Sequence, residues 1–188
     1  MGFTKIILPV CFILSSLGTS NDISYNNINI PKVSRVSPEL SLPEEKSFDF
    51  WVGKWHASWD EGDGKIGKAT NKITKILDSK VIKEDFRITE GQGKGFKGIS
   101  ISIYQPKLKR WKQAWADNQG GYYDLIGEFD DDKRIFKTQV VEKDGKKIVS
   151  RMVFMDIKKN SFTWDWESSY DGGKTWKLLW RIKYERAL

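Results

Sequence analysis

The sequence has almost no cysteine or histidine, since Cys11 and His56 are the only examples of each. Cys11 lies in an apolar run at the N-terminus. We therefore expect the exported chain to contain no disulfide, no thiol nucleophile and no cysteine-based metal site. A single histidine also excludes a metal site built on two histidines, and a Ser-His-Asp triad would have to use His56. The sequence thus predicts that no metal is bound.

The sequence also lacks an excess of acidic residues. It has 32 Lys and Arg against 25 Asp and Glu, which gives a net charge of +7, and 13% of its residues are aromatic. So many aromatic residues exclude a disordered chain, and 188 residues are typical of one domain. The basic residues are spread along the chain rather than grouped in blocks, which favours anionic partners in general.

The N-terminus has the features of an export signal. Lys5 precedes an apolar run, 6–17, that is too short to span a bilayer. The small residues Gly18 and Ser20 fit cleavage after Ser20. We predict a signal peptide at 1–20 and a periplasmic or secreted protein, which argues against a nucleic-acid partner. No other run is long and apolar enough to span a membrane.

The segment that follows the predicted signal, 21–43, is polar and contains three of the five prolines. It shows no hydrophobic periodicity, so we expect a linker, or a strap that lies on the domain. The folded domain is predicted to occupy 44–188.

Hydrophobic residues in this domain alternate with period two, which indicates β-strands, and no segment shows a strong helical stripe. Short turns separate the strands, which predicts an all-β fold built as a single antiparallel meander. Closure into a roughly ten-stranded lipocalin-like barrel would avoid two unpaired edges, and a barrel of that width is expected to hold a central cavity. The predicted strands are 50–59, 67–77, 80–89, 96–104, 110–118, 122–129, 134–142, 146–157, 161–169 and 175–186.

Charged side chains interrupt otherwise apolar strand faces. Glu84 shares a face with Ile82 and Phe86, and Arg151 shares one with Val153. A buried charge without partners is costly, so these residues indicate either an internal polar network that fixes strand register or a polar, tryptophan-walled ligand pocket. We predict that six further residues bind a ligand in such a pocket: Ser100, Gln113, Trp115, Asp117, Tyr123 and Trp166.

Five short motifs stand in order between residues 47 and 187. They are Phe-Asp-Phe-Trp-Val-Gly-Lys-Trp at 48–55, Gly-Ile-Ser at 98–100, Trp-Lys-Gln-Ala-Trp-Ala-Asp at 111–117, Ser-Ser-Tyr-Asp-Gly-Gly-Lys-Thr-Trp at 168–176 and Tyr-Glu-Arg at 184–186. Together they resemble the lipocalin-like, usually bacterial family catalogued as domain of unknown function 1579. The resemblance implies a calycin-like barrel and no agreed activity. His56 departs from the pattern, because an acidic or small polar residue is expected after this tryptophan.

An exported, basic, tryptophan-rich barrel suits an anionic oligosaccharide, because indole faces stack on sugar rings and cations hold carboxylates. We therefore predict a lyase of the hydro-lyase (dehydratase) type that acts on uronic-acid-containing oligosaccharides during polysaccharide degradation, by elimination at a terminal uronic acid. In this hypothesis Arg151, or else Arg87, neutralises the substrate carboxylate. His56 or Glu84 removes the C5 proton, and Tyr104, or else Tyr122 or Tyr123, protonates the leaving oxygen.

A second hypothesis is a non-catalytic lipocalin-like protein that binds a small amphipathic or anionic ligand. The elimination hypothesis requires that His56, Arg151 and a tyrosine meet in one cavity, whereas the binding hypothesis does not. With Trp55 and Trp59 inward, His56 points outward, unless a β-bulge reverses the phase. Neither hypothesis needs a cofactor, and haem ligation by a histidine near the C-terminus is excluded because the chain has none there.

Overall fold

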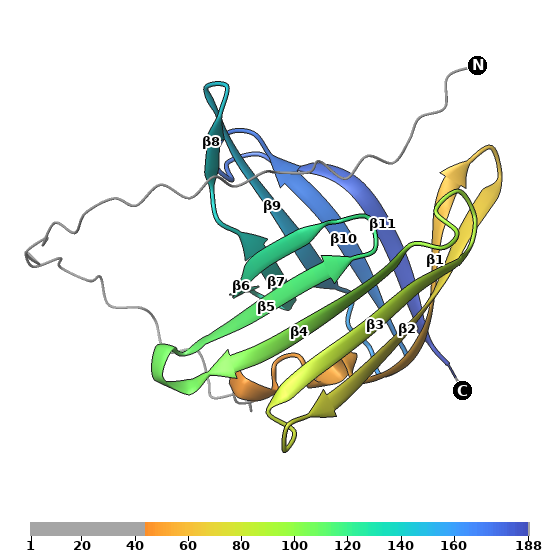
Figure 1. The fold of residues 1–188 in the computed structure, drawn as a ribbon, viewed down its shortest axis with the longest axis horizontal. Helices are drawn as coiled ribbons and strands as arrows, with labels where there is room; N and C mark the ends of the chain where they lie inside the picture. The colour runs from red at the N-terminus through yellow and green to blue at the C-terminus, as the bar shows by residue number, and fades with distance from the viewer. Residues whose placement is uncertain (1–43, 188) are drawn as a thin grey trace, which may run out of the picture.

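The computed structural model describes residues 44–187, which are almost entirely β-sheet (Figure 1). The predicted signal peptide, 1–20, and linker, 21–43, lie outside the described residues. Within the described part, no helix is long and apolar enough to cross a membrane. Three short 3-10 helices are present: η1 Glu44–Lys46, η2 Asp49–Trp51 and η3 Pro106–Leu108. The strands are β1 Gly53–Gly62, β2 Lys65–Ile76, β3 Val81–Glu90, β4 Lys97–Gln105, β5 Arg110–Asp117, β6 Tyr122–Asp130, β7 Lys133–Thr138, β8 Val141–Lys143, β9 Lys146–Met155, β10 Ser161–Ser169 and β11 Lys177–Arg186.

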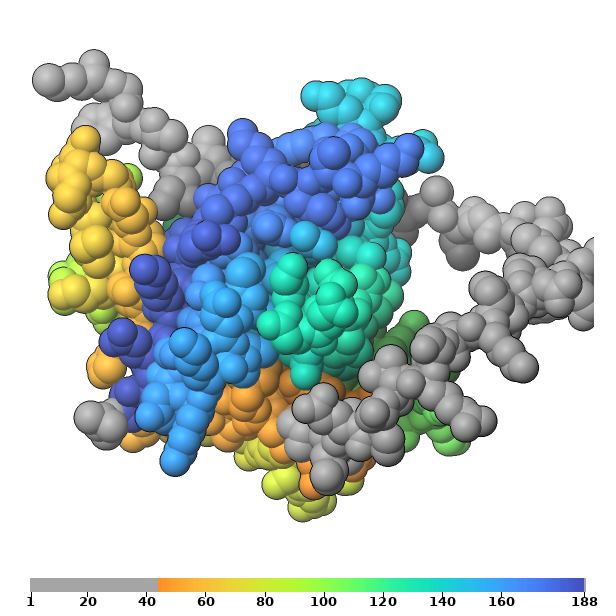
Figure 2. All heavy atoms as spheres, turned by 180° about the vertical axis from the view of Figure 1, so that it is seen from behind, coloured from red at the N-terminus to blue at the C-terminus, as the bar shows by residue number. Residues whose placement is uncertain are grey.

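Ten of these strands close into an antiparallel barrel, which confirms the fold predicted from the sequence. Around the barrel, β1 to β7 follow in chain order, then β9, β10 and β11, and β11 pairs with β1 to complete the ring. Figure 2 shows the molecule from behind, where the blue C-terminal strands lie beside the green segment of β6 and β7. Closure leaves no unpaired edge within the ring.

The seventh predicted strand, 134–142, is divided in the structure. β7 ends at Thr138, whose hydroxyl accepts a hydrogen bond from the backbone N–H of Ser150 (3.0 Å) and donates one to its carbonyl (3.3 Å). These side-chain bonds replace the backbone hydrogen bonds that would continue the pairing of β7 with β9. β8 then pairs only with the start of β9, as a hairpin strand outside the ring.

The chain before β1 closes one end of the barrel, where η1 and η2 lie beneath the strands (orange, Figure 1). The sequence predicts that Phe50 and Trp51 begin the first strand, but both lie in η2. The backbone N–H of Trp51 donates to the carbonyl of Phe48 (3.2 Å), and pairing with β2 starts only at Gly53. Trp51 and Phe48 are buried there and form the floor of the barrel.

Arg186, near the end of β11, holds this floor in place. Its guanidinium carbon lies 4.1 Å from the ring centroid of Trp55, and its Nη atoms donate to the carbonyls of Val52 (3.0 Å) and Phe50 (3.3 Å). Gly53 has a φ of 147°, and a Cβ on it would overlap the guanidinium. The glycine of the Trp-Val-Gly-Lys-Trp segment is therefore required both for its backbone conformation and for close approach.

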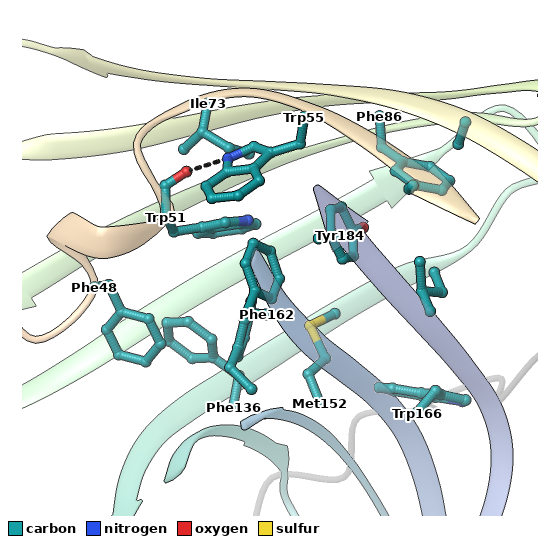
Figure 3. Packing of buried hydrophobic residues seen from close by; sticks show 14 of the residues in the cluster. Phe48, Trp51, Trp55, Ile73, Phe86, Phe136, Met152, Phe162, Trp166 and Tyr184 are labelled. Carbon is teal, nitrogen blue, oxygen red and sulfur yellow. Dashed lines mark hydrogen bonds between the residues drawn. The ribbon is translucent and has the colours of Figure 1, made fainter. Parts of the chain in front are cut away.

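Aromatic rings fill the half of the barrel next to the floor (Figure 3). Phe48 stacks on Phe136, and Phe162 stacks on Tyr184, each with ring centroids 4.4 Å apart. Pairs of this kind add about 0.5–1.5 kcal/mol beyond the area that they bury. This layer supports the residues that surround the other half of the barrel.

Two glycines make room for indole rings in that other half. Gly67 lies beneath the ring of Trp59, and Gly98 lies beneath the ring of Trp115, so that a Cβ on either glycine would overlap the ring above it. Trp111, at the start of β5, donates its indole N–H to the carbonyl of Glu44 at the floor (2.8 Å). Trp115 lies four residues farther along the strand, roughly 13 Å away. It is therefore held toward the opposite end of the barrel.

Candidate functional site

A cavity lies above the floor of the barrel, and its walls are almost entirely aromatic and aliphatic. The cavity is small, with a volume of about 50 Å³, and it opens to solvent at one side. This volume is below the range of about 300–1,000 Å³ that is usual for the sites of drug-sized ligands. The space between the walls is therefore narrow and suits only a small ligand. The residues that line it are Trp51, Glu84, Phe86, Phe96, Trp115, Tyr123, Met152, Trp164, Trp166, Trp180, Ile182 and Tyr184.

Glu84, on β3, is the only carboxyl group in this lining, and it is only 5% exposed. Asn71 donates from Nδ2 to one carboxyl oxygen (2.7 Å), and the hydroxyl of Ser100 donates to the other (2.7 Å). Burial raises the pKa of Glu84 from 4.5 to about 7, although both hydrogen bonds act to lower it; the charge of Asp85 adds to the rise. At neutral pH, therefore, Glu84 is divided between its protonated and ionised forms.

The hydrogen bonds of Glu84 continue into the wall formed by β4 and β5. Gln113 is buried and donates from Nε2 to the hydroxyls of Ser100 (3.3 Å) and Ser102 (2.9 Å). Among the described residues, the side-chain oxygens of Gln113 and Asn71 are buried without a hydrogen-bond partner. An unpaired acceptor is costly to bury, so these oxygens call for a donor from water or from a ligand.

Tyr184 extends the polar cluster to β11. Its hydroxyl oxygen accepts a hydrogen bond from Asn71 Nδ2 (3.4 Å). Burial, followed by the negative charge of Glu84, raises the pKa of Tyr184, so its hydroxyl stays protonated at physiological pH. Glu84 and Tyr184 thus form one polar patch in an otherwise apolar cavity lining, and Asn71, Ser100 and Gln113 are bonded behind it.

Three indole N–H groups belong to the cavity wall and are buried without a partner among the described residues. They are those of Trp51, at the floor, and of Trp166 and Trp180, on the neighbouring strands β10 and β11. Buried indole N–H groups normally find an acceptor. These three donors are enclosed within the wall and are not presented to the cavity.

The structure brings six of the ten sequence-predicted site residues to this cavity. Glu84, Trp115, Tyr123 and Trp166 line it, Ser100 donates to Glu84, and Gln113 in turn donates to Ser100. A further predicted residue, Asp117, lies at the end of β5, where it accepts a hydrogen bond from Trp115 Nε1 (3.1 Å) and from two backbone N–H groups of the following turn. Asp117 therefore orients the ring of Trp115 and does not itself line the cavity.

His56 and Tyr104 do not join this cluster. Trp55 and Trp59 point inward, as β1 alternates, so His56 lies exposed on the outer face opposite Thr70 of β2 and Glu185 of β11. Tyr104 lies at the floor end of β4 and donates to the carboxylate of Glu44 (2.8 Å), a bond that raises the pKa of its hydroxyl. Neither residue contacts Glu84.

Arg151 also lies outside the barrel. Met152, the next residue of β9, lines the cavity, so Arg151 faces outward, where it pairs with Glu167 of β10 (2.6 Å). The indole of Trp176 covers its guanidinium at 3.8 Å. An ion pair between Arg151 and Glu84 inside the barrel is therefore not formed. The four residues predicted for elimination chemistry do not meet at one site.

Sequence reasoning missed several residues of the site. Asn71 stands between Ala69 and Ile73 on an apolar strand face, and this interruption is the same signal that identified Glu84. Tyr184 carries no such signal, because a tyrosine at an inward position is ordinary core. The others are the apolar wall residues Trp51, Phe86, Phe96, Met152, Trp164, Trp180 and Ile182.

The cavity lining contains no lysine, arginine or histidine. Within residues 44–187, no group of three or more His, Cys, Asp and Glu side chains is placed to hold a metal ion. Comparison of the sequence with protein-family models finds no match, and comparison with curated proteins finds none.

Proposed function

We propose that this protein is a lipocalin-like binding protein that holds a small, mainly apolar organic molecule inside its barrel. The observation that carries the proposal is a partly open cavity with walls of aromatic rings and one buried polar patch around Glu84. Ligand sites of proteins commonly combine apolar walls with a few polar groups that fix the orientation of the ligand.

Elimination from a uronic acid is less well supported by the same cavity. That reaction needs a cation beside the substrate carboxylate and a base beside the C5 proton. The cavity lining contains no cation, and Arg151 and His56 lie on the outer face. An anionic sugar would also be repelled by the ionised form of Glu84. Binding of a neutral or cationic apolar molecule is therefore the function that the geometry favours.

A fluorescence binding experiment tests this proposal. N-phenyl-1-naphthylamine, which fluoresces in apolar surroundings, should bind the purified protein saturably at one site per chain. Ile182→Trp places an indole in the cavity and should weaken the binding of the probe at least tenfold. Ile101→Trp adds the same indole to the outer face of β4, where the side chain is 48% exposed, and should leave binding unchanged. Equal binding by both variants, with both folded, would refute a site inside the barrel.

A further inference from the structure

The polar patch of the cavity contains more acceptors than donors. Glu84 faces Asn71 from β2, Ser100 from β4 and Tyr184 from β11; Asp85, the next residue on β3, points to the outer face. The two bonds that Glu84 receives leave lone pairs on both of its oxygens.

Other acceptors lie close to Glu84. The side-chain oxygen of Asn71 is buried without a partner, and so is that of Gln113, one hydrogen bond beyond Ser100. Both residues are at least nine-tenths buried. In the cavity lining, no lysine, arginine or histidine balances the carboxylate. These oxygens surround Glu84 with further acceptors, and Glu84 is the group among them that lines the cavity, so a positively charged donor in the cavity would pair with its carboxylate.

The remaining walls also suit a positive charge. Five indole rings and two phenyl rings surround the cavity, and aromatic faces attract cations through their quadrupoles. Figure 3 shows Trp51, Met152, Trp166, Phe86 and Tyr184 arranged around the same space. A carboxylate at one side of an aromatic enclosure is the combination expected for an organic ammonium ion with an apolar body.

We propose that the ligand of this cavity is an organic amine, whose ammonium group pairs with Glu84 while its apolar body packs against the indole rings. This inference rests on the proposed binding function and specifies its ligand class. The ammonium donates to a carboxyl oxygen of Glu84, which lines the cavity. Proton balance follows directly: the amine binds as a cation to the ionised carboxylate, so protein molecules that hold Glu84 protonated release that proton to solvent on binding.

A matched ligand series measured by isothermal titration calorimetry tests the inference. Tryptamine, tryptophol and indole-3-acetate share one indole body and differ in carrying an ammonium, a hydroxyl or a carboxylate. At pH 8, tryptamine should bind at least about tenfold more tightly than tryptophol, since a hydrogen bond to a charged group contributes more than a neutral one. Indole-3-acetate should bind most weakly, because Glu84 repels it. If tryptophol binds as well as tryptamine, the amine inference is wrong while the binding function stands. If none of the three binds, both fail.

The pH dependence of tryptamine binding tests the same inference on the unaltered protein. An alkyl ammonium stays charged between pH 6 and pH 8, whereas the ionised fraction of Glu84 rises from roughly one tenth to nine tenths around a pKa of about 7. The affinity for tryptamine should therefore increase about tenfold over this range, with close to one proton released per ligand at pH 6. An affinity that is constant with pH would overturn the inference.

Glu84→Gln supplies the second arm of the test. It keeps the shape of the side chain and should remove both the preference for tryptamine over tryptophol and the pH dependence. Asp85→Asn removes the neighbouring acid, which faces outward and pairs with Arg87, and should retain both. A folded Glu84→Gln variant that still prefers tryptamine would contradict the role of the carboxylate.

Discussion

Glu84→Gln should abolish a large pH dependence of folding stability. In the folded protein the pKa of Glu84 is raised from 4.5 to about 7, chiefly because the group is buried. An unfolded chain exposes the same carboxyl to water, where its ordinary pKa applies. Between these two values the folded state holds a proton that the unfolded state has lost. The free energy of unfolding therefore falls as the pH rises from 4.5, and it levels off above pH 7.

The magnitude follows from the interval between the two pKa values. Each pH unit within it corresponds to 1.36 kcal/mol, so about 2.5 units (7 minus 4.5) amount to about 3 kcal/mol in total. Over the accessible range from pH 5 to pH 7, the expected loss is about 2 kcal/mol. Glutamine at this position has no proton to lose, so the variant lacks this component.

Urea unfolding of both proteins at pH 5, 6, 7 and 8 measures the effect. The free energy of unfolding of Glu84→Gln, relative to the unaltered protein, should increase by about 2 kcal/mol between pH 5 and pH 7. The use of a difference cancels the titration of surface groups that both proteins share. Asp85→Asn, tested in the same way, should show only a small change, because the charge of Asp85 is the smallest of the causes that act on the pKa of Glu84. Parallel curves for Glu84→Gln and the unaltered protein would refute the burial of an ionisable carboxyl at this site.

Three further predictions concern the barrel and the residues outside its cavity. Gly98→Ala should displace the ring of Trp115 and lower the free energy of unfolding by about 1–3 kcal/mol in urea titrations, and an unchanged midpoint would contradict the close approach. Arg186→Ala should cost about 2–3 kcal/mol of stability in the same assay, and lysine should not rescue it, because a point charge cannot reach both floor carbonyls. Arg151→Ala and His56→Ala should each leave the dissociation constant of the naphthylamine probe unchanged in fluorescence titrations; a tenfold loss in either would place that residue in the site.

The inward residues of the cavity could largely be predicted from the sequence. Period-two alternation assigns Glu84, Ser100 and Trp115 to faces whose other members are buried, and a closed antiparallel sheet keeps this alternation on every strand. The same rule assigns His56 to the outer face. The fold and the residue types that line the cavity could therefore be predicted from the sequence alone.

Arg151 shows where alternation fails. Val149 and Val153, two residues to either side, are buried, so this face of β9 has the composition of an inner face. It is in fact the outer face. Trp176, from the segment before β11, covers Arg151 there. An apolar strand face indicates burial, but it does not say which side of the sheet is buried when a loop covers the outside.

The contact between Asn71 and Tyr184 could not be predicted from the sequence, for a different reason. The two residues are 113 positions apart and meet only because β11 pairs with β1, which pairs with β2. The relative register of three strands decides which side chains converge, and the alternation within each strand carries no information about it.

Methionine methyl NMR tests the central claim, a ligand site inside the barrel, most directly. The chain has three methionines: Met1, Met152, which lines the cavity, and Met155, on the outer face of the same strand. In a titration of ¹³C-methyl-methionine-labelled protein with tryptamine at pH 8, the Met152 signal should shift saturably while the Met155 signal stays in place. A Met152 signal that does not move, or one that moves no more than that of Met155, would contradict binding within the cavity.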